Sequence, residues 1–572
     1  MIGVIAQAAE RGVVEEFFQL FKTPWEFYRE GRSYDVVVVT ADEVPDVDAK
    51  LVLVYGAELK RRDPVATTLT ALSEGRTVLI DYQGSRVPVY GAVRVFEKGE
   101  GGIPCITADA GIVGVKVPSS DCTMLRLGYS LFREVEYLLS VGQPPENAHT
   151  PTLDMHIMML RDWILDAGIT LLEIPPSPSG HRFAVCLTHD IDFLRVRDHK
   201  FDHTMWGFLY RSTVGAVCNF LRRRISWRRL VSSWCAAASL PLVHLGWAKD
   251  FWLPFDWYLQ VEKNLPSTYF LIPFKHHAGD RAAGRHAKRR ATSYDISDIP
   301  EWTATLIREA RELAVHGIDS WHSRDRGREE LRAIETATGR SDIGVRMHWL
   351  WNNENTFREL EEAGYAYDST VGYNETIGYR AGTTQAYRPL GTRRLLELPL
   401  HVQDGAMFYR QRLDLTEPEA WRRCATLIGN ANTFGGVLTI LWHDRSHGPE
   451  RFWGDFYARL LGELKSLDPW FATGGQVTNW FRQRREVVFE YPSAHGPDHL
   501  HVRYRGERVD PPLTLRVHCP NGPAEECHPV SGQACRTTDI PWTGESEVEF
   551  AQLLREVSNP PAQTHLALPS YP

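Results

Sequence analysis

Short apolar runs and amphipathic stretches alternate along most of the chain, and their order predicts regions of different architecture. In residues 1–150, the runs 34–40, 51–55 and 77–81 are almost wholly apolar and are bounded by polar turns. Continuous runs of this kind are typical of strands that are buried on both faces. We therefore expect an α/β domain with a largely parallel sheet at 1–150. No glycine-rich phosphate-binding motif follows these runs, so the sequence does not indicate a role for this domain.

The region 181–483 carries the longest alternation of the two patterns. Its predicted strands are 183–187, 267–272, 312–316, 343–346, 395–399 and 436–441. Its predicted helices are 298–315, 327–338, 353–364, 418–432 and 450–466. Alternation repeated over about 300 residues indicates a βα barrel, in which chemistry gathers at the C-terminal ends of the strands.

The two stretches that flank this region have other patterns. Residues 151–180 hold a helical stretch between proline clusters, and we interpret them as a linker. From 484 to 572, apolar and polar residues alternate with a period of two, and proline and glycine are frequent between the runs. This pattern predicts a small β-rich accessory domain, which could bind carbohydrate or be a structural appendage.

A third stretch, 203–252, interrupts the barrel pattern and reads as a helical insertion. Its tryptophans are interleaved with arginines, as in Arg222-Arg223-Arg224. This mixture suits a helical lid or dimer contact, with arginines lying over apolar surface. It also suits an amphipathic helix that lies on a membrane surface. Both interpretations stay open at the level of sequence.

Composition excludes some classes of function. The chain of 572 residues has a formal net charge of −8, which gives no basic footprint for nucleic acid. Its nine cysteines are dispersed without a CxxC pair, which argues for a reducing compartment. The first residues lack the features of a signal peptide. We therefore expect a cytoplasmic protein, in contact at most with the inner face of a membrane.

Polar side chains with metal and acid–base chemistry follow several predicted strands. Asp190 and Asp192 end the first strand of the barrel region, and side chains two residues apart face the same way on a strand. Alone, such a pair is more often a turn or cap. His316 ends another strand, His322 follows on the same loop, and His443 comes after a further apolar run. A metal-assisted hydrolase needs about three protein ligands and open positions, which this set could supply.

Five motifs in this order resemble those of the polysaccharide deacetylase family, also called the NodB-homology family or carbohydrate esterase family 4. They are Thr188–Asp192, His316–His322, Gly344–Trp349, Leu398–Asp404 and Leu438–His443. The resemblance covers about residues 181–450 and is that of a divergent member. It implies a distorted (β/α)7 barrel and one divalent metal ion, zinc or a similar ion.

The resemblance also implies a role for each matching residue. The implied ligands of the metal are Asp192, His316 and His322. The implied acid–base groups are Asp190 as general base, His443 as general acid, Arg346 as the partner of Asp190, and Asp404 as a brace of the site.

The second motif departs from the common pattern. The family spaces its two histidines four residues apart, and Ser320 occupies that position here. Either His322 reaches the metal through an altered loop, or the site has a single histidine ligand and Asp319 or water substitutes. We interpret the nearby His189 and His348 as hydrogen-bonding neighbours.

The resulting hypothesis is a metal-dependent deacetylase that removes an N-acyl group, acetyl or formyl, from a sugar of a polysaccharide or of a nucleotide- or lipid-linked glycoconjugate precursor. One alternative is a glycoside hydrolase, in which two carboxylates on a related barrel do the chemistry. The other is a non-catalytic carbohydrate-binding protein, which is favoured if His322 points away from Asp192.

Overall fold

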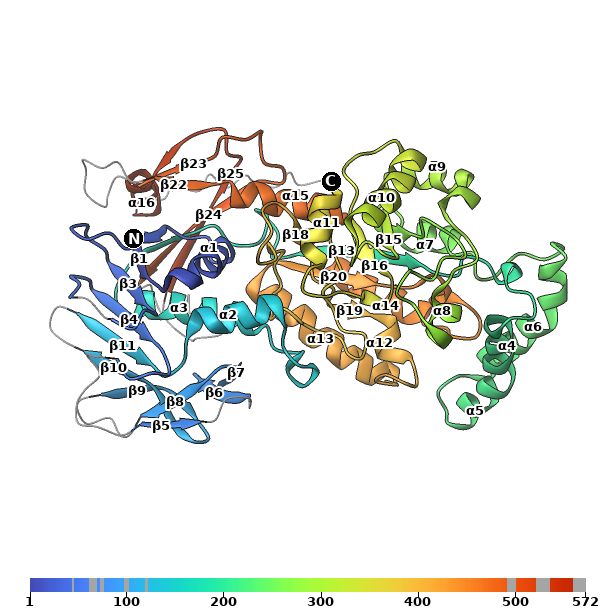
Figure 1. Cartoon of the computed structure of the whole chain (residues 1–572), viewed down its shortest axis with the longest axis horizontal. Coiled ribbons are helices and arrows are strands. Elements are labelled where there is room, and N and C mark those ends of the chain that lie inside the picture. The colour runs from blue at the N-terminus through green and yellow to red at the C-terminus, as the bar shows by residue number, and fades with distance from the viewer. Residues whose placement is uncertain are drawn as a thin grey trace, which may run out of the picture. The chain divides into compact units, whose positions relative to one another are not determined.

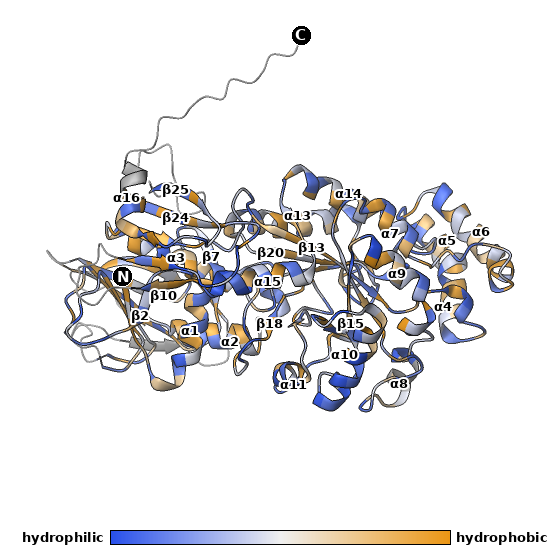
Figure 2. Cartoon of the chain, turned by 90° about the horizontal axis from the view of Figure 1, so that it is seen from above, coloured by the Kyte–Doolittle hydropathy of each residue, from blue (hydrophilic) through white to orange (hydrophobic). Residues whose placement is uncertain are grey.

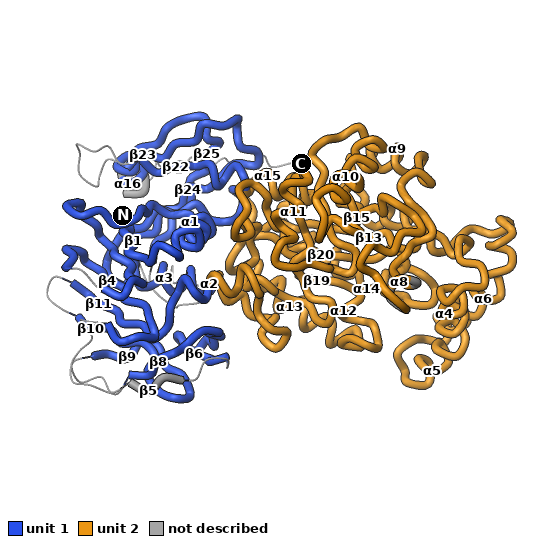
Figure 3. The backbone as a smooth tube through the Cα atoms, in the orientation of Figure 1, with its two compact units in different colours: residues 1–134, 155–179, 482–572 blue, residues 135–154, 180–481 orange. Residues whose placement is uncertain are grey.

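The computed structural model describes residues 1–43, 46–60, 69–72, 77–96, 102–118, 122–490, 500–520 and 535–558. The chain forms two compact units (Figure 3). One consists of residues 1–134, 155–179 and 482–572, and the other of residues 135–154 and 180–481. Figure 1 labels the helices and strands of both.

The second unit is built on a parallel sheet in the order β18-β17-β16-β15-β14-β13-β20-β19, with β21 (Trp470–Phe471) beside β13. The strands of this path are β13 (Ala184–Ile191), β14 (Thr268–Leu271), β15 (Glu312–Gly317), β16 (Val345–Met347), β17 (Tyr367–Asp368), β18 (Leu396–Glu397), β19 (Val402–Gln403) and β20 (Val437–Leu441). All pairings along it are parallel. The helices between them include α9 (Pro300–Arg308), α10 (Arg324–Thr338), α11 (Thr356–Ala363), α13 (Glu417–Phe434) and α14 (Gly454–Ser466). The predicted α/β class with a distorted barrel is confirmed, although the path holds eight strands where seven were expected.

The barrel is distorted because its two edge strands are not hydrogen-bonded into one ladder. The edge strands β18 and β19 are separated in sequence only by residues 398–401. Within this link, the Leu398 N–H donates to Asp368 O at 2.8 Å, and the His401 N–H donates to Thr439 O at 3.2 Å. The chain itself therefore spans the open side, from the edge at β18 to the edge at β19.

The core of this unit explains why the predicted strands form. All eight residues of β13 are buried, as are all residues of β14, β15 and β20. Val185 and Leu187 on β13 belong to one apolar cluster that also includes Val315 and Val345 of neighbouring strands. Each such side chain contributes about 1.5–3 kcal/mol when it is fully buried. A rigid sheet of this kind can hold polar groups at its strand ends.

The first unit contains a mixed sheet in the order β2-β1-β3-β4-β11-β10-β9-β6-β7. The strands β1 (Ile2–Ile5), β2 (Trp25–Phe27), β3 (Val36–Val39), β4 (Leu51–Tyr55) and β11 (Thr123–Leu127) pair in parallel. The strands β6 (Val78–Tyr82), β7 (Ser85–Val89), β9 (Ile103–Ala108) and β10 (Gly111–Pro118) pair antiparallel. The run 77–81 does form a strand, β6, but this strand pairs antiparallel and so departs from the largely parallel sheet that was expected. In β6, Leu79 is exposed and Val78 half-buried, so the run is not covered on both faces.

The C-terminal segment belongs to the first unit and does not stand apart as an accessory domain. β24 (Leu513–Pro520) pairs antiparallel with β25 (Cys535–Trp542) and with β12 (Leu171–Glu173), which lies in the predicted linker. Arg484 is buried at the predicted boundary, and its side chain donates to Leu20 O and Ile174 O at 3.1 and 2.6 Å. The strands predicted at 487–491 and 499–504 appear as β22 (Val488–Glu490) and β23 (His501–Arg503), and residues 491–499 lie outside the described residues.

Candidate active site

The polar residues predicted for the site come together at one end of the parallel sheet. Asp190 is the second-last residue of β13. His316 is the second-last residue of β15, where the strand register pairs it with Arg346 of β16. His443 follows β20 by two residues. Parallel strands bring their C-terminal ends to the same edge, which is where barrel enzymes place their chemistry.

Asp192, His316 and His348 form a compact group with three possible metal-ligand atoms. Asp192 Oδ1 lies 3.2 Å from His316 Nε2 and 3.1 Å from His348 Nδ1. The two ring nitrogens are 2.9 Å apart. One carboxylate and two imidazoles is a donor set typical of zinc and similar divalent ions.

Three further observations fit a cation at this group. Asp192 Oδ1 is buried, and no hydrogen bond satisfies it among the described residues. His316 Nδ1 lies 3.0 Å from Arg346 O, and because a carbonyl only accepts, Nδ1 carries the proton and Nε2 presents a lone pair. Burial lowers the pKa of His348 to about 4, although Asp192 opposes this, so its ring is neutral and able to bind a metal.

His322, the expected third ligand, lies elsewhere. Its Nε2 is 2.9 Å from Asp319 Oδ1, and it is not among the three residues that group with Asp192. Asp319 also contacts His277 Nε2 at 2.7 Å and accepts the Asp280 N–H with both oxygens. His322 thus belongs to a second group of histidines and carboxylates, whereas His348 lies with Asp192 and His316 in the first.

His348 could have been recognised from the sequence. It lies two residues after Arg346, and side chains with that spacing share one face of a strand. Because Arg346 was expected in the site, this spacing would also have placed the His348 side chain there. The residue that follows, Trp349, has a φ of 67°, a left-handed conformation that is costly for a bulky residue and is concentrated at functional sites.

Arg346 holds Asp190 in place. Its Nη1 donates to Asp190 Oδ1 at 3.0 Å and to Thr188 Oγ1 at 2.8 Å, while Nε and Nη2 donate to the carbonyl and hydroxyl of Ser369. The guanidinium is fully buried and lies over the Phe270 ring at 4.3 Å. The other oxygen of Asp190, Oδ2, faces the metal-ligand group at 3.8 Å from His316 Nε2. Asp190 is therefore a hydrogen-bond acceptor held in a fixed position beside the group.

Asp404 orients His443. Asp404 Oδ1 lies 2.5 Å from His443 Nδ1, and Oδ2 accepts the His443 backbone N–H at 2.9 Å and the Ser446 hydroxyl. Burial would lower the pKa of His443, but the Asp404 carboxylate raises it to about 10. Burial would raise the pKa of Asp404, but His443 holds it below its usual range. His443 is thus a protonated imidazole with its Nε2 free of this pair.

Two neighbours of these residues have structural roles. The Asp444 carboxylate accepts the N–H groups of Phe193 and Leu194 at 2.7 and 2.9 Å, and so ties the loop after β13 to the loop after β20. His189 is fully buried, and its ring nitrogens contact Glu262 Oε1 and Trp442 O. His189 is the hydrogen-bonding neighbour that the sequence predicts.

An aromatic row begins at the metal-ligand group. The Trp349 ring stacks on His348 at 5.7 Å, and Trp351 meets Trp349 and Trp321 edge to face. Trp349 and Trp351 are half-buried, whereas Trp442 is fully buried in the core. The partly exposed rings offer flat apolar faces next to the site.

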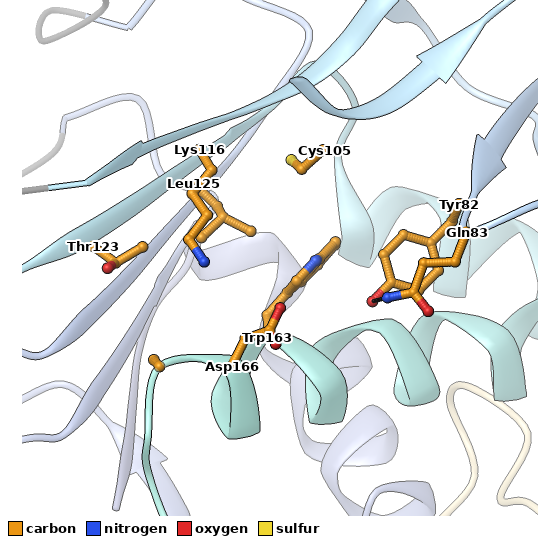
Figure 4. Close-up of a pocket in the computed structure, with 9 residues that line it drawn as sticks. Tyr82, Gln83, Cys105, Lys116, Thr123, Leu125, Trp163 and Asp166 are labelled. Atoms are coloured by element: carbon orange, nitrogen blue, oxygen red, sulfur yellow. Dashed lines mark hydrogen bonds between the residues drawn. The ribbon is translucent and has the colours of Figure 1, made fainter. Parts of the chain in front are cut away.

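The first unit has a small cavity of its own. It is lined by Tyr82, Gln83, Cys105, Lys116, Thr123, Leu125, Trp163, Asp166 and Ala167 (Figure 4). Its volume of about 200 Å³ is below the range of 300–1,000 Å³ that is usual for ligand pockets. The cavity therefore does not identify a function for this unit.

No family model and no curated protein matches the chain. Among solved structures, a proposed polysaccharide deacetylase from Mycobacterium smegmatis is 19% identical, with a TM-score of 0.33, over 56% of this chain and 99% of its own. The carbohydrate deacetylase Agd3 is 8% identical, with a TM-score of 0.36, over 96% of this chain and 99% of its own. A family 4 acetyl xylan esterase from Clostridium thermocellum, solved with a cobalt ion, is 12% identical, with a TM-score of 0.22, over 52% of this chain and 90% of its own.

Proposed function

We propose that the protein is a metal-dependent hydrolase that removes an N-acyl group, acetyl or formyl, from a sugar. The observation that carries this proposal is one arrangement of three parts. Asp192, His316 and His348 form a ligand group, the ion pair of Asp190 and Arg346 adjoins it, and the pair of His443 and Asp404 lies at the same strand ends. Metal-assisted amide hydrolysis uses these three elements together: a metal site, a base and an acid.

Asp192, His316 and His348 would hold one divalent ion, zinc or a similar metal. When bound, the ion would lower the pKa of a water molecule and polarise the acyl oxygen. Asp190 is placed to accept the proton of the attacking water, because Oδ1 is fixed by Arg346 and Oδ2 faces the ligand group. The buried guanidinium fixes the direction of this carboxylate.

His443 is placed to donate a proton to the leaving amine. An amine leaves poorly unless it is protonated, and a positioned acid contributes about 10²- to 10⁴-fold to such a step. The pKa of His443, raised to about 10 by Asp404, keeps the imidazole protonated at neutral pH. Asp404 in turn fixes the ring through Nδ1, so that the opposite nitrogen, Nε2, delivers the proton.

The protonation states argue against a glycoside hydrolase. That reaction needs one carboxyl group that is protonated and acts as the acid. Burial would raise the pKa of Asp192, but His348 and His316 hold it well below its usual range. Asp190 is paired with Arg346. Asp192 is thus ionised and Asp190 is held in an ion pair, so neither is placed as the protonated acid, and His443 takes that role instead.

The non-catalytic alternative depended on His322 pointing away from Asp192. His322 contacts Asp319 and is not in the group of Asp192, but His348 is a third possible ligand in that group. A functional ligand set is therefore retained. Trp349 and Trp351 add the flat surfaces that a sugar ring stacks on.

We propose a polysaccharide or a nucleotide- or lipid-linked glycoconjugate precursor as the substrate, and cytoplasmic action as the setting. Contact of residues 203–252 with a membrane surface would bring a lipid-linked precursor to this site. These finer assignments are predictions from the sequence.

The test is acyl release from a panel of N-acetylated and N-formylated saccharides by the full chain, with metal content measured on the same samples. We expect about one metal ion per chain and activity that is lost on chelation and restored by zinc or cobalt. Asp190→Asn should abolish turnover and retain the metal, whereas His316→Ala should lose both. A metal-free protein, or activity that is unaffected by both substitutions, would disprove the proposal.

A further inference from the structure

The helical insertion of the second unit has an unusual charge. Residues 203–249 contain six arginines and one lysine and no aspartate or glutamate, in a chain whose net charge is −8. The segment forms α4 (His203–Tyr210), a π-helical turn (Arg211–Gly215), α5 (Ala216–Leu221) and α6 (Trp227–His244), which gather beside one another in Figure 1. The insertion is therefore a local cationic surface on an acidic protein.

The same segment exposes most of the large apolar side chains that face solvent. Of seventeen such residues among the described ones, nine lie in this segment and a tenth, Phe201, lies just before it. They are Phe201, Trp206, Tyr210, Val214, Leu221, Trp227, Trp234, Leu242, Leu245 and Trp247. Figure 2 shows these helices with hydrophobic and hydrophilic residues intermixed. Single exposed apolar residues need no explanation, but a concentration of this kind marks an interaction surface.

Helix α6 has two apolar faces, of which only one is covered. Leu230, Leu240 and Val243 are buried, and the last two belong to the small core of the insertion with Phe208 and Trp252. Trp227 and Trp234, seven residues apart, lie on the opposite side and are 57% and 40% exposed. Leu242 and Leu245 continue this uncovered stripe. Helices with apolar residues on two sides normally have both sides covered, so the uncovered side of α6 calls for a partner.

Aromatic rings extend the uncovered stripe. The Trp227 ring meets Phe220 at 5.9 Å and Trp234 at 6.1 Å, both edge to face. Tryptophan prefers the boundary between water and lipid, because its ring is apolar and its N–H is polar. A row of such rings at the surface matches this boundary.

The cations near the stripe are divided between two roles. Arg224 pairs with Asp414, and Arg229 with Asp455, each at 2.5 Å, and these pairs attach the insertion to the rest of its unit. Arg222, Arg223 and Arg228 are exposed and form no ion pair within the described part of the chain. Three cations thus remain available beside uncovered tryptophans.

We infer that this face of the insertion, formed by Trp227, Trp234, Leu242, Leu245, Arg222 and Arg223, binds the surface of an anionic lipid bilayer. No helix among the described residues is long and apolar enough to cross a membrane, so the insertion would lie on the surface. A second copy of the chain fits less well, because two surfaces without acidic residues repel each other. A closing lid fits less well too, since the inner side of α6 is already packed.

This inference gives the proposed deacetylase a location for its substrate, but lipid binding does not depend on catalysis. The test is co-sedimentation of the full chain with vesicles of phosphatidylcholine, with and without 30% phosphatidylglycerol as an experimental choice of roughly physiological charge. We expect binding to the anionic vesicles that weakens with salt. Asp190→Asn should bind as the unsubstituted protein does, so a failure of the catalytic proposal is separable.

Two double variants test the face itself. Trp227→Ser with Trp234→Ser removes the apolar anchor, and Arg222→Glu with Arg223→Glu should weaken binding by roughly 30-fold or more, since each cation near such a surface contributes about 1 kcal/mol. Leu59→Ser and Arg340→Glu are matched exposed controls outside the insertion. Equal thermal unfolding verifies that each variant folds. The inference is overturned by no binding to anionic vesicles at low salt, by equal binding of all variants, or by a concentration-dependent dimer that the tryptophan variant abolishes without vesicle binding.

Discussion

His443 and Asp404 form a pair in which one buried carboxylate contacts both the ring and the backbone of the partly exposed histidine, at 2.5 Å to Nδ1 and 2.9 Å to the N–H. The two residues come from different strand ends, after β20 and β19. The carboxylate therefore fixes both the direction of the imidazole and its charge. The raised pKa of His443, about 10, follows from this pairing.

Replacing Asp404 by Asn should shift the alkaline limb of activity. The amide keeps the shape but removes the charge, so the pKa of His443 falls, by roughly 1–3 units for the loss of an adjacent opposite charge. The acid form is then lost at lower pH, and kcat/KM declines earlier as pH rises. A pH profile of acyl release measures this. Asp444→Asn is a control, because Asp444 binds backbone N–H groups of another loop. An unmoved alkaline limb would argue against His443 as the acid.

The metal ligands can be tested with a pair of histidines. His348→Ala should lower metal affinity by at least about 100-fold, because loss of a direct ligand costs more than the 10- to 100-fold of an outer neighbour. His322→Ala should leave metal content unchanged, since its ring contacts Asp319 and not Asp192. Metal per chain is measured after dialysis against a weak chelator. The reverse result would restore His322 as a ligand.

Much of this site could be predicted from the sequence because strand ends are local features. The apolar runs before Asp190, His316 and His443 placed these residues at strand ends, and a parallel sheet collects such ends at one edge. His348 was predicted only as a neighbour, because family spacing drew attention to His322. The spacing of two from Arg346 carried the better information.

The division into units could not be predicted in the same way. β12 and β24 are more than 300 residues apart in sequence, and their pairing depends on tertiary contacts that local patterns do not encode. Proline clusters around β12 suggested a linker instead. Arg484 illustrates the same limit, since its partners at Leu20 and Ile174 are distant in the chain.

Arg346 should be essential for stability as well as for the site. It is fully buried with Asp190, and removing one partner of a buried ion pair leaves the other charge uncompensated. Arg346→Met should therefore cost about 3–5 kcal/mol in the free energy of unfolding. Denaturant unfolding measures this loss. The double variant with Asp190→Asn should recover part of it, because the unpaired charge is gone. Additive losses in the double variant would contradict the coupling.

A second buried pair, Asp368 and Glu397, should make stability depend on pH, and removing one partner should stabilise the protein at high pH. Burial raises the pKa of Asp368 to about 6, although hydrogen bonds with Glu397 and Thr370 act against it. Burial and the Asp368 carboxylate together raise the pKa of Glu397 well above its usual range. Asp368 Oδ2 and Glu397 Oε2 are buried and find no donor among the described residues, which fits a proton shared between the two groups. The folded state then binds more protons than the unfolded state. The contribution of this pair to stability is therefore fully present below the ordinary carboxyl pKa values and is lost as pH rises through the raised ones.

Glu397→Gln should remove this dependence on pH. The amide oxygen can still accept the Val371 N–H, which donates to Glu397 at 2.8 Å, and the amide NH₂ can donate to Asp368 without a titrating proton. We expect the variant to be more stable than the unsubstituted protein at pH 8, because folding no longer has to keep a raised-pKa carboxyl protonated. The gain should be roughly 1 kcal/mol for each unit by which folding raised that pKa. Unfolding midpoints at pH 5 and pH 8 measure the difference.

The same substitution at Glu312 is the matched control, because the surroundings of Glu312 predict a loss of stability instead of a gain. Both oxygens of Glu312 already accept: Tyr367 and Gly475 donate to Oε1, and Thr268 and Gly475 to Oε2. In Glu312→Gln an NH₂ group faces donors, which should cost about 1–3 kcal/mol at both pH values. Opposite signs for the two variants at pH 8 would locate the shared proton at Asp368 and Glu397. Equal destabilisation of the two variants would show that Glu397, like Glu312, acts only as a hydrogen-bond acceptor and shares no proton with Asp368.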